Sequence, residues 1–148
     1  MSEYLSITVF AALIVAFAVV SLVAEASATV VGHVLFSPVT VEPSPGSCLG
    51  VGLAPLAVRP ALQRRGIGAR LVDSGLEASR RAGFGFVVVL GEPRYYQRFG
   101  FQRALTEGLR NEYGVDEECM VLELQPGALI GASGVVRYGP EFAAVAAG

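Results

Sequence analysis

The stretch Leu56-Ala-Val-Arg-Pro-Ala-Leu-Gln-Arg-Arg-Gly-Ile-Gly-Ala-Arg70 connects an apolar run to an amphipathic one. The apolar run, residues 53–58, predicts a strand buried on both faces. Apolar or small residues then recur at helical spacing over residues 66–82, and Gly83 follows as the residue that ends the predicted helix. A loop with two glycines between a strand and a helix leaves the first amide donors of the helix unpaired at its positive end. Such a junction is typical of a phosphate-binding site.

The segments on either side extend this unit into a mixed sheet. Residues 84–90 predict a second buried strand and residues 94–99 a short helix. Later strands are expected at Phe101 and at residues 120–124. Upstream, residues 21–41 predict a hairpin around a small-residue turn. A strand, helix, strand unit inside a hairpin-rich chain predicts an α+β fold with a mixed sheet.

The N-terminal segment admits three interpretations, of which a signal peptide is the weakest, because no positive charge precedes the apolar run although Ala26-Ser27-Ala28 resembles a cleavage site. A run of 21 uncharged, mostly apolar residues ends before Glu25, and about 20 such residues suffice to cross a bilayer as a helix. A membrane anchor over residues 5–24 is therefore one interpretation. The favoured one is a helix near residues 5–17 followed by a strand near residues 19–25, since that strand would pair into the hairpin. On this basis we expect residues 1–20 to form a divergent apolar segment.

Composition narrows the classes of function. The 148 residues are 53% hydrophobic and 16% charged, which fits one globular domain and argues against disorder. All 11 basic residues are arginine, so chemistry that needs a lysine, such as a Schiff base or a Walker phosphate loop, is excluded. One histidine, His33, and two separated cysteines, Cys48 and Cys119, are too few for a zinc site, and we expect no metal. The cysteines are expected to be free thiols in a reducing compartment, which favours the cytoplasm.

Positive charge is concentrated in the middle of the chain. Residues 1–58 hold no arginine, whereas residues 59–103 hold nine arginines against Asp73, Glu77 and Glu92. The net charge of the whole chain is −2. A basic centre in an acidic protein indicates one local polyanionic ligand rather than general affinity for nucleic acid.

One motif lies at the start of the predicted helix, and a second motif follows the next predicted strand. Each resembles a family signature. They are Gln63-Arg-Arg-Gly-Ile-Gly68 and Tyr95-Tyr-Gln-Arg-Phe-Gly-Phe101. The first matches the Gln/Arg-x-x-Gly-x-Gly/Ala signature of the GNAT superfamily of acyl-CoA-dependent N-acetyltransferases, and the second is similar to its Tyr-x-x-x-Gly-Phe segment. The resemblance covers residues 21–143 and implies an N-acetyltransferase-like domain over residues 21–148. It implies a three-layer fold in which helices flank a mostly antiparallel sheet and two splayed strands hold the CoA arm.

The same resemblance implies acetyl-CoA as a co-substrate. Backbone groups at the strand end would pair with the pantetheine arm, and amides at the helix entry would bind the pyrophosphate. The implied cofactor-binding residues are Leu56, Ala57, Val58, Arg64, Arg65, Gly66, Ile67, Gly68 and Ala69. An amide near Leu56 would polarise the thioester carbonyl, and the acyl group would pass directly to an amine in a ternary complex.

Protonation of the departing CoA thiolate is assigned by the resemblance to Tyr96. Tyr95 is the alternative, because adjacent helical residues point about 100° apart and only one of the two should face the thiolate. A free tyrosine holds its proton more tightly than a thiol does, so either cationic Arg94 or Arg98 nearby lowers the tyrosine pKa, or Tyr96 only hydrogen-bonds the sulfur.

The general base is less well defined. The predicted strand over residues 53–58 contains no carboxylate, although many relatives carry one there. Glu92, at the end of the next strand, is preferred over His33 on the hairpin, and water is the third option. The resemblance also implies a strand and two helices before the hairpin, where this sequence has the 20 residues of the apolar segment. We therefore expect an acceptor pocket that is truncated or rebuilt by the apolar N-terminal segment.

Other functions stay open at this point. A non-catalytic acyl-CoA-binding or protein-interaction module would keep Gly66 and Gly68 but lack an operative base. A membrane-anchored enzyme would use residues 5–24 as its span. A dinucleotide enzyme is disfavoured, because the Gly-x-Gly-x-x-Gly fingerprint needs glycine where the chain has Leu71. The amine acceptor is not identified, and a homodimer that buries the apolar N-terminal face is a further interpretation.

Overall fold

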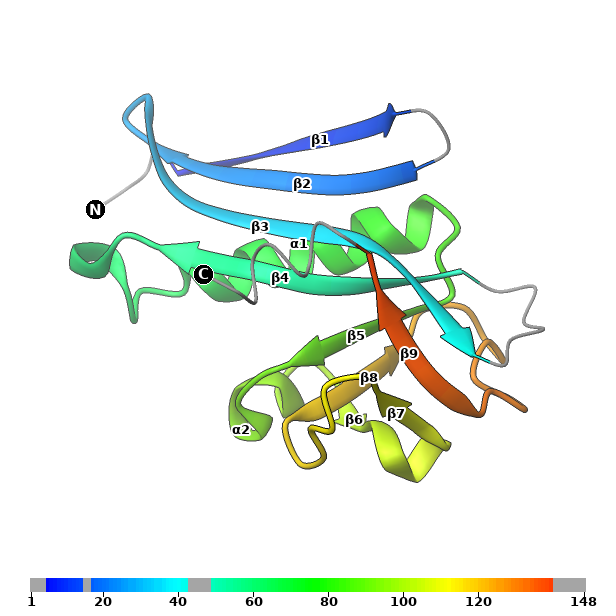
Figure 1. The fold of residues 1–148 in the computed structure, drawn as a ribbon. Helices are drawn as coiled ribbons and strands as arrows, with labels where there is room; N and C mark the ends of the chain where they lie inside the picture. Colours follow the sequence, from blue (N-terminus) through cyan, green and yellow to red (C-terminus); the bar gives the residue numbers. More distant parts are fainter. Residues whose placement is uncertain (1–4, 15–16, 43–48, 140–148) are drawn as a thin grey trace.

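The computed structural model of the protein describes residues 5–14, 17–42 and 49–139 (Figure 1). In this part of the chain the strands form one mixed sheet in the order β1-β2-β3-β4-β5-β8-β6, and β9 joins it by pairing with both β3 and β7. The strands are β1 (Ser6–Ile14), β2 (Phe17–Ala26), β3 (Thr29–Glu42), β4 (Gly50–Val58), β5 (Phe86–Leu90), β6 (Gln102–Arg103), β7 (Leu109–Asn111), β8 (Cys119–Glu123) and β9 (Gly134–Tyr138). The β4–β5 and β7–β9 pairs are parallel and the other pairs are antiparallel, so the predicted mixed, mostly antiparallel sheet is confirmed.

The helices match their expected positions. They are α1 (Ile67–Arg81) and α2 (Pro93–Gln97), with short 3-10 turns at Pro60–Leu62 and Ala104–Glu107. Gly83 follows α1 with a φ of 93°, a left-handed conformation that favours glycine after a helix end.

The N-terminal segment forms a strand pair and not a helix. β1 and β2 pair antiparallel over their whole length, so the helix expected near residues 5–17 is wrong. The run contains no charged residue to mark the solvent side of a helix, it begins with β-branched and aromatic residues, and β2 offers it a full row of backbone partners. β2 also crosses the position between residues 20 and 21 at which the domain was expected to begin. None of the helices in the described ranges is long and apolar enough to cross a bilayer.

The predicted hairpin is confirmed by β2 and β3. Its turn lies at Ser27 and Ala28, whose φ angles of 52° and 63° suit a tight hairpin turn. β3 is the longest strand, and it pairs with β2, β4 and β9. It therefore ties the N-terminal hairpin to the rest of the sheet (Figure 1).

The sheet separates two apolar cores. On one face α1 buries a stripe of residues formed by Ile67, Leu71, Val72, Gly75, Leu76 and Ser79. A Cβ at Gly75 would lie 2.1 Å from the Phe36 ring of β3, so glycine is required for this close approach. On the other face Phe86 and Val88 of β5 pack in a second cluster that includes Leu109, Cys119 and Val136.

β4 and β5 part after three residue pairs. They pair from Gly50 opposite Phe86 to Gly52 opposite Val88. Beyond this point β5 continues beside β8, whereas residues 53–58 of β4 continue beside β3 alone within the described part of the chain. The two parallel strands therefore splay apart at their carboxyl ends.

A bulge in β4 accounts for part of this divergence. Between its pairs with Val34 and Phe36 of β3, β4 contains one residue more than β3 does, and such a bulge bends a strand. Pro55, which lacks an amide donor, lies in this bulge. Leu53 is buried, but residues 54–58 are partly or fully exposed, so the expectation of burial on both faces is wrong for them. Their exposure follows from the missing second neighbour strand.

Candidate active site

The N-terminus of α1 presents backbone donors to solvent. Its N-cap is Gly66, with a φ of 85°, and no side chain of the described residues caps the helix. The first hydrogen bond runs from the Arg70 amide to the Gly66 carbonyl (3.0 Å), and the amides of Ile67, Gly68 and Ala69 have no partner among the residues described. A Cβ atom placed on Gly66 would meet no heavy atom of the other described residues within 4 Å. These amides and the positive end of the helix are therefore open to an anion.

A cleft of about 570 Å³ extends from this helix end to β4 and α2, a size within the usual range of ligand pockets. Its lining residues are Leu56, Val58, Leu62, Gln63, Arg64, Gly66, Gly68, Ala69, Tyr95 and Arg98. The cleft therefore combines the splayed end of β4, the loop before α1 and one side of α2.

Most of the predicted cofactor-binding residues meet in this cleft. Those that line it are Leu56, Val58, Arg64, Gly66, Gly68 and Ala69. Ala57 and Arg65 are exposed outside the lining, and Ile67 is buried beneath the helix end. Leu62 and Gln63 line the cleft although neither was among the predicted site residues. Gln63 belongs to the quoted motif, and its side-chain amide donates to the Val58 carbonyl (3.0 Å), which ties the loop to the end of β4.

The edge of β4 that faces the gap carries unpaired backbone groups. The Arg59 amide donates to the Val31 carbonyl (2.9 Å), which fixes the alternation of hydrogen-bonded pairs along the β3–β4 ladder. Ala57 is then in a hydrogen-bonded pair with β3, whereas the N–H and C=O groups of Leu56 and Val58 point away from β3. The Val58 carbonyl accepts a hydrogen bond from the Gln63 side chain, which agrees with a carbonyl that points away from β3.

Tyr95 and Arg98 form the α2 side of the cleft. The Tyr95 hydroxyl oxygen lies 3.1 Å from the position that a Cβ on Gly68 would take, so this side chain reaches across to the end of α1. The Arg98 guanidinium carbon lies 4.4 Å from the centre of the Tyr95 ring, and its Nε donates to the Tyr95 carbonyl (3.3 Å). This stacking holds a positive charge beside the cleft.

Tyr96 is buried beside the cleft and is not among the described residues that line it. Its ring fills the space at Gly91, where a Cβ would lie 2.5 Å from the ring, and it meets Phe101 edge-on. Burial, together with the neighbouring Tyr95, raises the pKa of Tyr96 to about 12. The expected lowering of this pKa by a nearby arginine is therefore wrong for Tyr96. Its role as the proton donor stays a prediction.

Glu92 begins α2 as its N-cap. Its carboxylate accepts from the Arg94 amide (3.3 Å), and its carbonyl accepts from the amides of Tyr95 and Tyr96 (3.1 and 3.2 Å). The side chain is exposed and does not belong to the described lining of the cleft. Its geometry is that of a helix cap, and its use as a base stays a prediction.

The second predicted base, His33, lies on β3. It is directly opposite Ala57 in the β3–β4 ladder and is partly buried. Its Nε2 lies 3.0 Å from Ser21 Oγ on β2.

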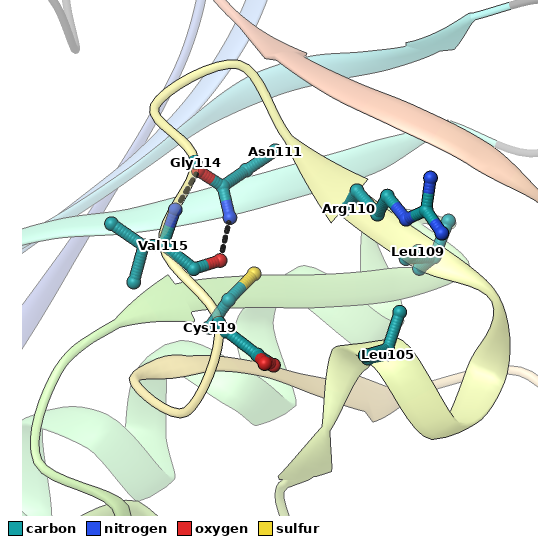
Figure 2. Close-up of a pocket in the computed structure, with 8 residues that line it drawn as sticks. Leu105, Leu109, Arg110, Asn111, Gly114, Val115 and Cys119 are labelled. Atoms are coloured by element: carbon teal, nitrogen blue, oxygen red, sulfur yellow. Dashed lines mark hydrogen bonds between the residues drawn. The ribbon is translucent and has the colours of Figure 1, made fainter.

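A smaller cavity, of about 210 Å³, adjoins the second apolar core (Figure 2). The Asn111 side chain braces its rim, because it donates to the Val115 carbonyl and accepts from the Val115 amide. Cys119 contributes its thiol, whose pKa is raised by burial. Cys119 is a free thiol, whereas Cys48 lies outside the described residues. No group of three or more His, Cys, Asp or Glu side chains in the described ranges is arranged to hold a metal ion.

The site combines splayed parallel strands, an open helix N-terminus and a cleft between them. A model of the acetyltransferase (GNAT) domain matches residues 18–103, more than half of the chain. The protein belongs to the GNAT family.

Two curated relatives come from Escherichia coli K12. The chain is similar to an uncharacterized N-acetyltransferase, YhbS, with 40% identity over 115 residues, which cover 76% of this chain and 67% of YhbS. It is 39% identical over 118 residues to a second uncharacterized N-acetyltransferase, YjhQ, with 75% and 65% covered. The chain thus spans about two thirds of the length of these relatives.

Two solved structures share the fold. One is the GNAT family N-acetyltransferase YhbS from E. coli in complex with CoA, with a TM-score of 0.77 and 37% identity, covering 84% of this chain and 69% of that one. The other is a GNAT family acetyltransferase from Brucella melitensis in complex with acetyl-CoA, with a TM-score of 0.65 and 35% identity, covering 83% and 68%. The protein is an acyl-CoA-dependent N-acetyltransferase.

Proposed function

We propose that this protein transfers an acetyl group from acetyl-CoA directly to a primary amine while both substrates are bound. The observation that carries the proposal is the cleft that joins the uncapped N-terminus of α1 to the unpaired edge of β4. An anion site and an unpaired strand edge in one cleft suit a ligand with a pyrophosphate at one end and amide groups along its arm. The two relatives whose structures contain CoA or acetyl-CoA support this ligand.

The residues of the cleft fit CoA at both ends. At α1, the amides of Gly68 and Ala69 offer donors to the pyrophosphate, and Arg64 adds positive charge. At β4, the Leu56 carbonyl and the Val58 amide point away from β3 and offer partners for the amides of the pantetheine arm. When bound, acetyl-CoA supplies an activated acyl group. We propose that the Leu56 amide donates to its thioester carbonyl, since a single such donor is worth about 3 kcal/mol of transition-state stabilisation.

We propose separate roles for the two tyrosines. Tyr95 closes the phosphate end of the cleft, because its hydroxyl lies beside Gly68. Tyr96, beside Gly91 at the end of β5, hydrogen-bonds the CoA sulfur. Full proton transfer from a phenol with a pKa of about 12 to the thiolate of a thiol with a pKa of about 8.5 is uphill by about 5 kcal/mol. Tyr96 therefore donates a hydrogen bond and keeps its proton.

A non-catalytic acyl-CoA-binding module is the weaker alternative. Its supporting observation from the sequence was the lack of a carboxylate on β4, but the curated relatives named above are N-acetyltransferases. Three further proposals rest on the sequence. The acceptor is an amine, the protein is located in the cytoplasm, and it forms a homodimer.

The test combines binding with turnover. Acetyl-CoA at 100 times its dissociation constant adds about 2.7 kcal/mol of stability, which raises the unfolding midpoint of a chain of this size by about 8 °C. NADH at the same concentration is expected to cause no shift. Release of the CoA thiol is then followed with a panel of primary amines that includes cadaverine, benzylamine and glycinamide. Binding without transfer to any amine of a broad panel would favour the non-catalytic module.

A further inference from the structure

We propose that His33 is the proton acceptor for the incoming amine and that Ser21 is its positioning residue. This inference rests on the proposed acetyl transfer to an amine and adds the group that makes the amine nucleophilic. It is carried by the juxtaposition of three side chains, Ser21 on β2, His33 on β3 and Ala57 on β4, on one face of the sheet.

His33 lies on the face of the sheet opposite α1. Leu56 and Val58 point toward the α1 face, where they line the cleft, so Ala57 between them points to the opposite face. His33 is directly opposite Ala57 in a hydrogen-bonded pair, and the two side chains are therefore neighbours on that face. β3 lies one strand spacing, roughly 5 Å, from β4, and the splay lies on the other side of β4. An amine that approaches the splay from this face passes beside the imidazole.

Ser21 contacts one ring nitrogen of His33 and leaves the other without a hydrogen bond among the described residues. Its Oγ lies 3.0 Å from Nε2 of His33, and no other hydrogen bond to the ring is present among the described residues. When Ser21 accepts the Nε2 proton, the neutral ring keeps its lone pair on Nδ1, which is free to take a proton. Ser21 thus orients the ring without touching the substrate.

Few charged groups compete at this position. By alternation along their strands, Glu25 of β2 and Arg59 after β4 share the face with His33, and β1 contributes no charged side chain. β9 meets β3 only from Val39 onward, away from His33. Glu92, the other candidate base, is held as the N-cap of α2.

The proposed step balances in atoms and charge. The ammonium form of the acceptor gives one proton to Nδ1 of His33, and its nitrogen lone pair then forms the new C–N bond. The nitrogen loses its second proton to solvent as the C–S bond breaks, and the CoA thiolate leaves with the hydrogen bond from Tyr96 and takes a proton from solvent. The imidazolium returns its proton to water.

The test compares an acceptor that needs a base with one that does not. His33→Gln is assayed with the best cationic amine of the panel and with hydroxylamine, which is neutral at pH 7. We expect kcat/KM to fall by about 100-fold with the cationic amine and by less than about threefold with hydroxylamine. Ser21→Ala should show a smaller loss with the same amine, and Ser21→Thr should restore activity.

Controls separate a catalytic role from a structural one. His33→Gln should show the same midpoint shift with acetyl-CoA as the unchanged protein. Should that variant not fold, His33→Ala with added imidazole provides the second route, and recovery of turnover is the supporting result. An equal loss with both acceptors, or a selective loss with the cationic amine in Glu92→Gln and not in His33→Gln, would overturn the assignment. If the unchanged protein acetylates neither kind of acceptor while binding acetyl-CoA, the proposed function itself fails.

Discussion

The site has two strand-to-helix junctions, one before α1 and one before α2, which follow the neighbouring parallel strands β4 and β5. The junctions differ in whether the first backbone amides of the helix have hydrogen-bond partners. Before α1 the N-cap is Gly66, no described side chain caps the helix, and the amides of Ile67, Gly68 and Ala69 are left without partners. Before α2, Pro93 has no amide proton, and Glu92 accepts from each of the next three amides through its carboxylate or its carbonyl.

The difference determines what each junction can contribute to chemistry. A helix end with unsatisfied donors binds a ligand through backbone groups, so it requires that no side chain caps or covers those groups. A helix end that is satisfied internally contributes only the side chains that it positions, here Tyr95 and Tyr96. The first junction is therefore expected to control affinity for acetyl-CoA, and the second to control turnover through Tyr96 and to contribute to affinity through Tyr95.

The largest effect is expected from Gly66→Val. The residue has a φ of 85°, which a β-branched side chain tolerates poorly, and its substitution would both distort the helix entry and place methyl groups over the free amides. Loss of two charge-assisted hydrogen bonds to a phosphate corresponds to a rise in the dissociation constant of acetyl-CoA of about 100-fold or more. Isothermal titration would measure it.

Gly83→Val is the matched control for this substitution. Gly83 lies at the other end of α1 with a φ of 93°, and a Cβ there also meets no described atom within 4 Å. The control should lose a similar amount of stability through backbone strain and keep its affinity for acetyl-CoA. Equal weakening of binding by both variants would mean that the effect of Gly66→Val is strain and that the amides do not bind the pyrophosphate.

The next largest effect is expected from Tyr96→Phe. Loss of a hydrogen bond to a developing thiolate should lower kcat by about 10- to 100-fold and leave the dissociation constant of acetyl-CoA unchanged. Because burial raises the pKa of Tyr96 to about 12, its hydroxyl stays protonated up to at least pH 10, and its ionisation should cause no loss of kcat below that pH. Steady-state kinetics from pH 6 to 10 checks both statements.

Tyr95→Phe serves as the comparison within the same helix. It should raise KM for acetyl-CoA with little change in kcat, since the Tyr95 hydroxyl lies at the phosphate end. If Tyr95→Phe lowers kcat and Tyr96→Phe does not, the roles of the two tyrosines are reversed.

The two junctions also differ in how far the sequence alone could describe them. Before α1, the glycines, the arginine-rich loop and the helical period are all local signals, and most of the cofactor residues predicted from them line the cleft. Before α2, the motif places both tyrosines correctly on a short helix, but it does not show which one is buried. That depends on Gly91 and Phe101 from neighbouring segments, which receive the Tyr96 ring.

Errors in the sequence-based prediction arose where long-range partners decide the structure. The uninterrupted apolar run over residues 6–14 suits a helix or a strand by composition, and only pairing with β2 settles it. The direction of the Ala57 side chain, toward the face of His33, follows from pairing with β3 and has no local signal, and its role in cofactor binding stays a prediction. The joining of β9 to both β3 and β7 carries no local signal at all.

A several-fold effect is expected from Gly68→Ala, which couples the two junctions. A Cβ at this position would lie 3.1 Å from the Tyr95 hydroxyl oxygen, so the tyrosine must shift. We expect KM for acetyl-CoA to rise by about threefold to tenfold, because the helix geometry itself tolerates alanine. In the background of Tyr95→Phe the same substitution should have a smaller effect, and a double-mutant cycle measures this coupling. Strict additivity would show that the two side chains act on acetyl-CoA independently.

The smallest effect is expected from Glu92→Ala. Loss of an N-cap costs about 1 kcal/mol, which lowers the unfolding midpoint of a chain of this size by about 3 °C. Glu92→Asn keeps a capping side chain without the charge and should restore most of that stability. If capping is its only role, both variants retain kcat with a cationic amine, because α2 still carries Tyr96 to the same place. A loss of kcat shared by both variants, with the stability of Glu92→Asn intact, would show instead that the carboxylate takes part in the reaction, and the second junction would then supply a base as well as a hydrogen-bond donor.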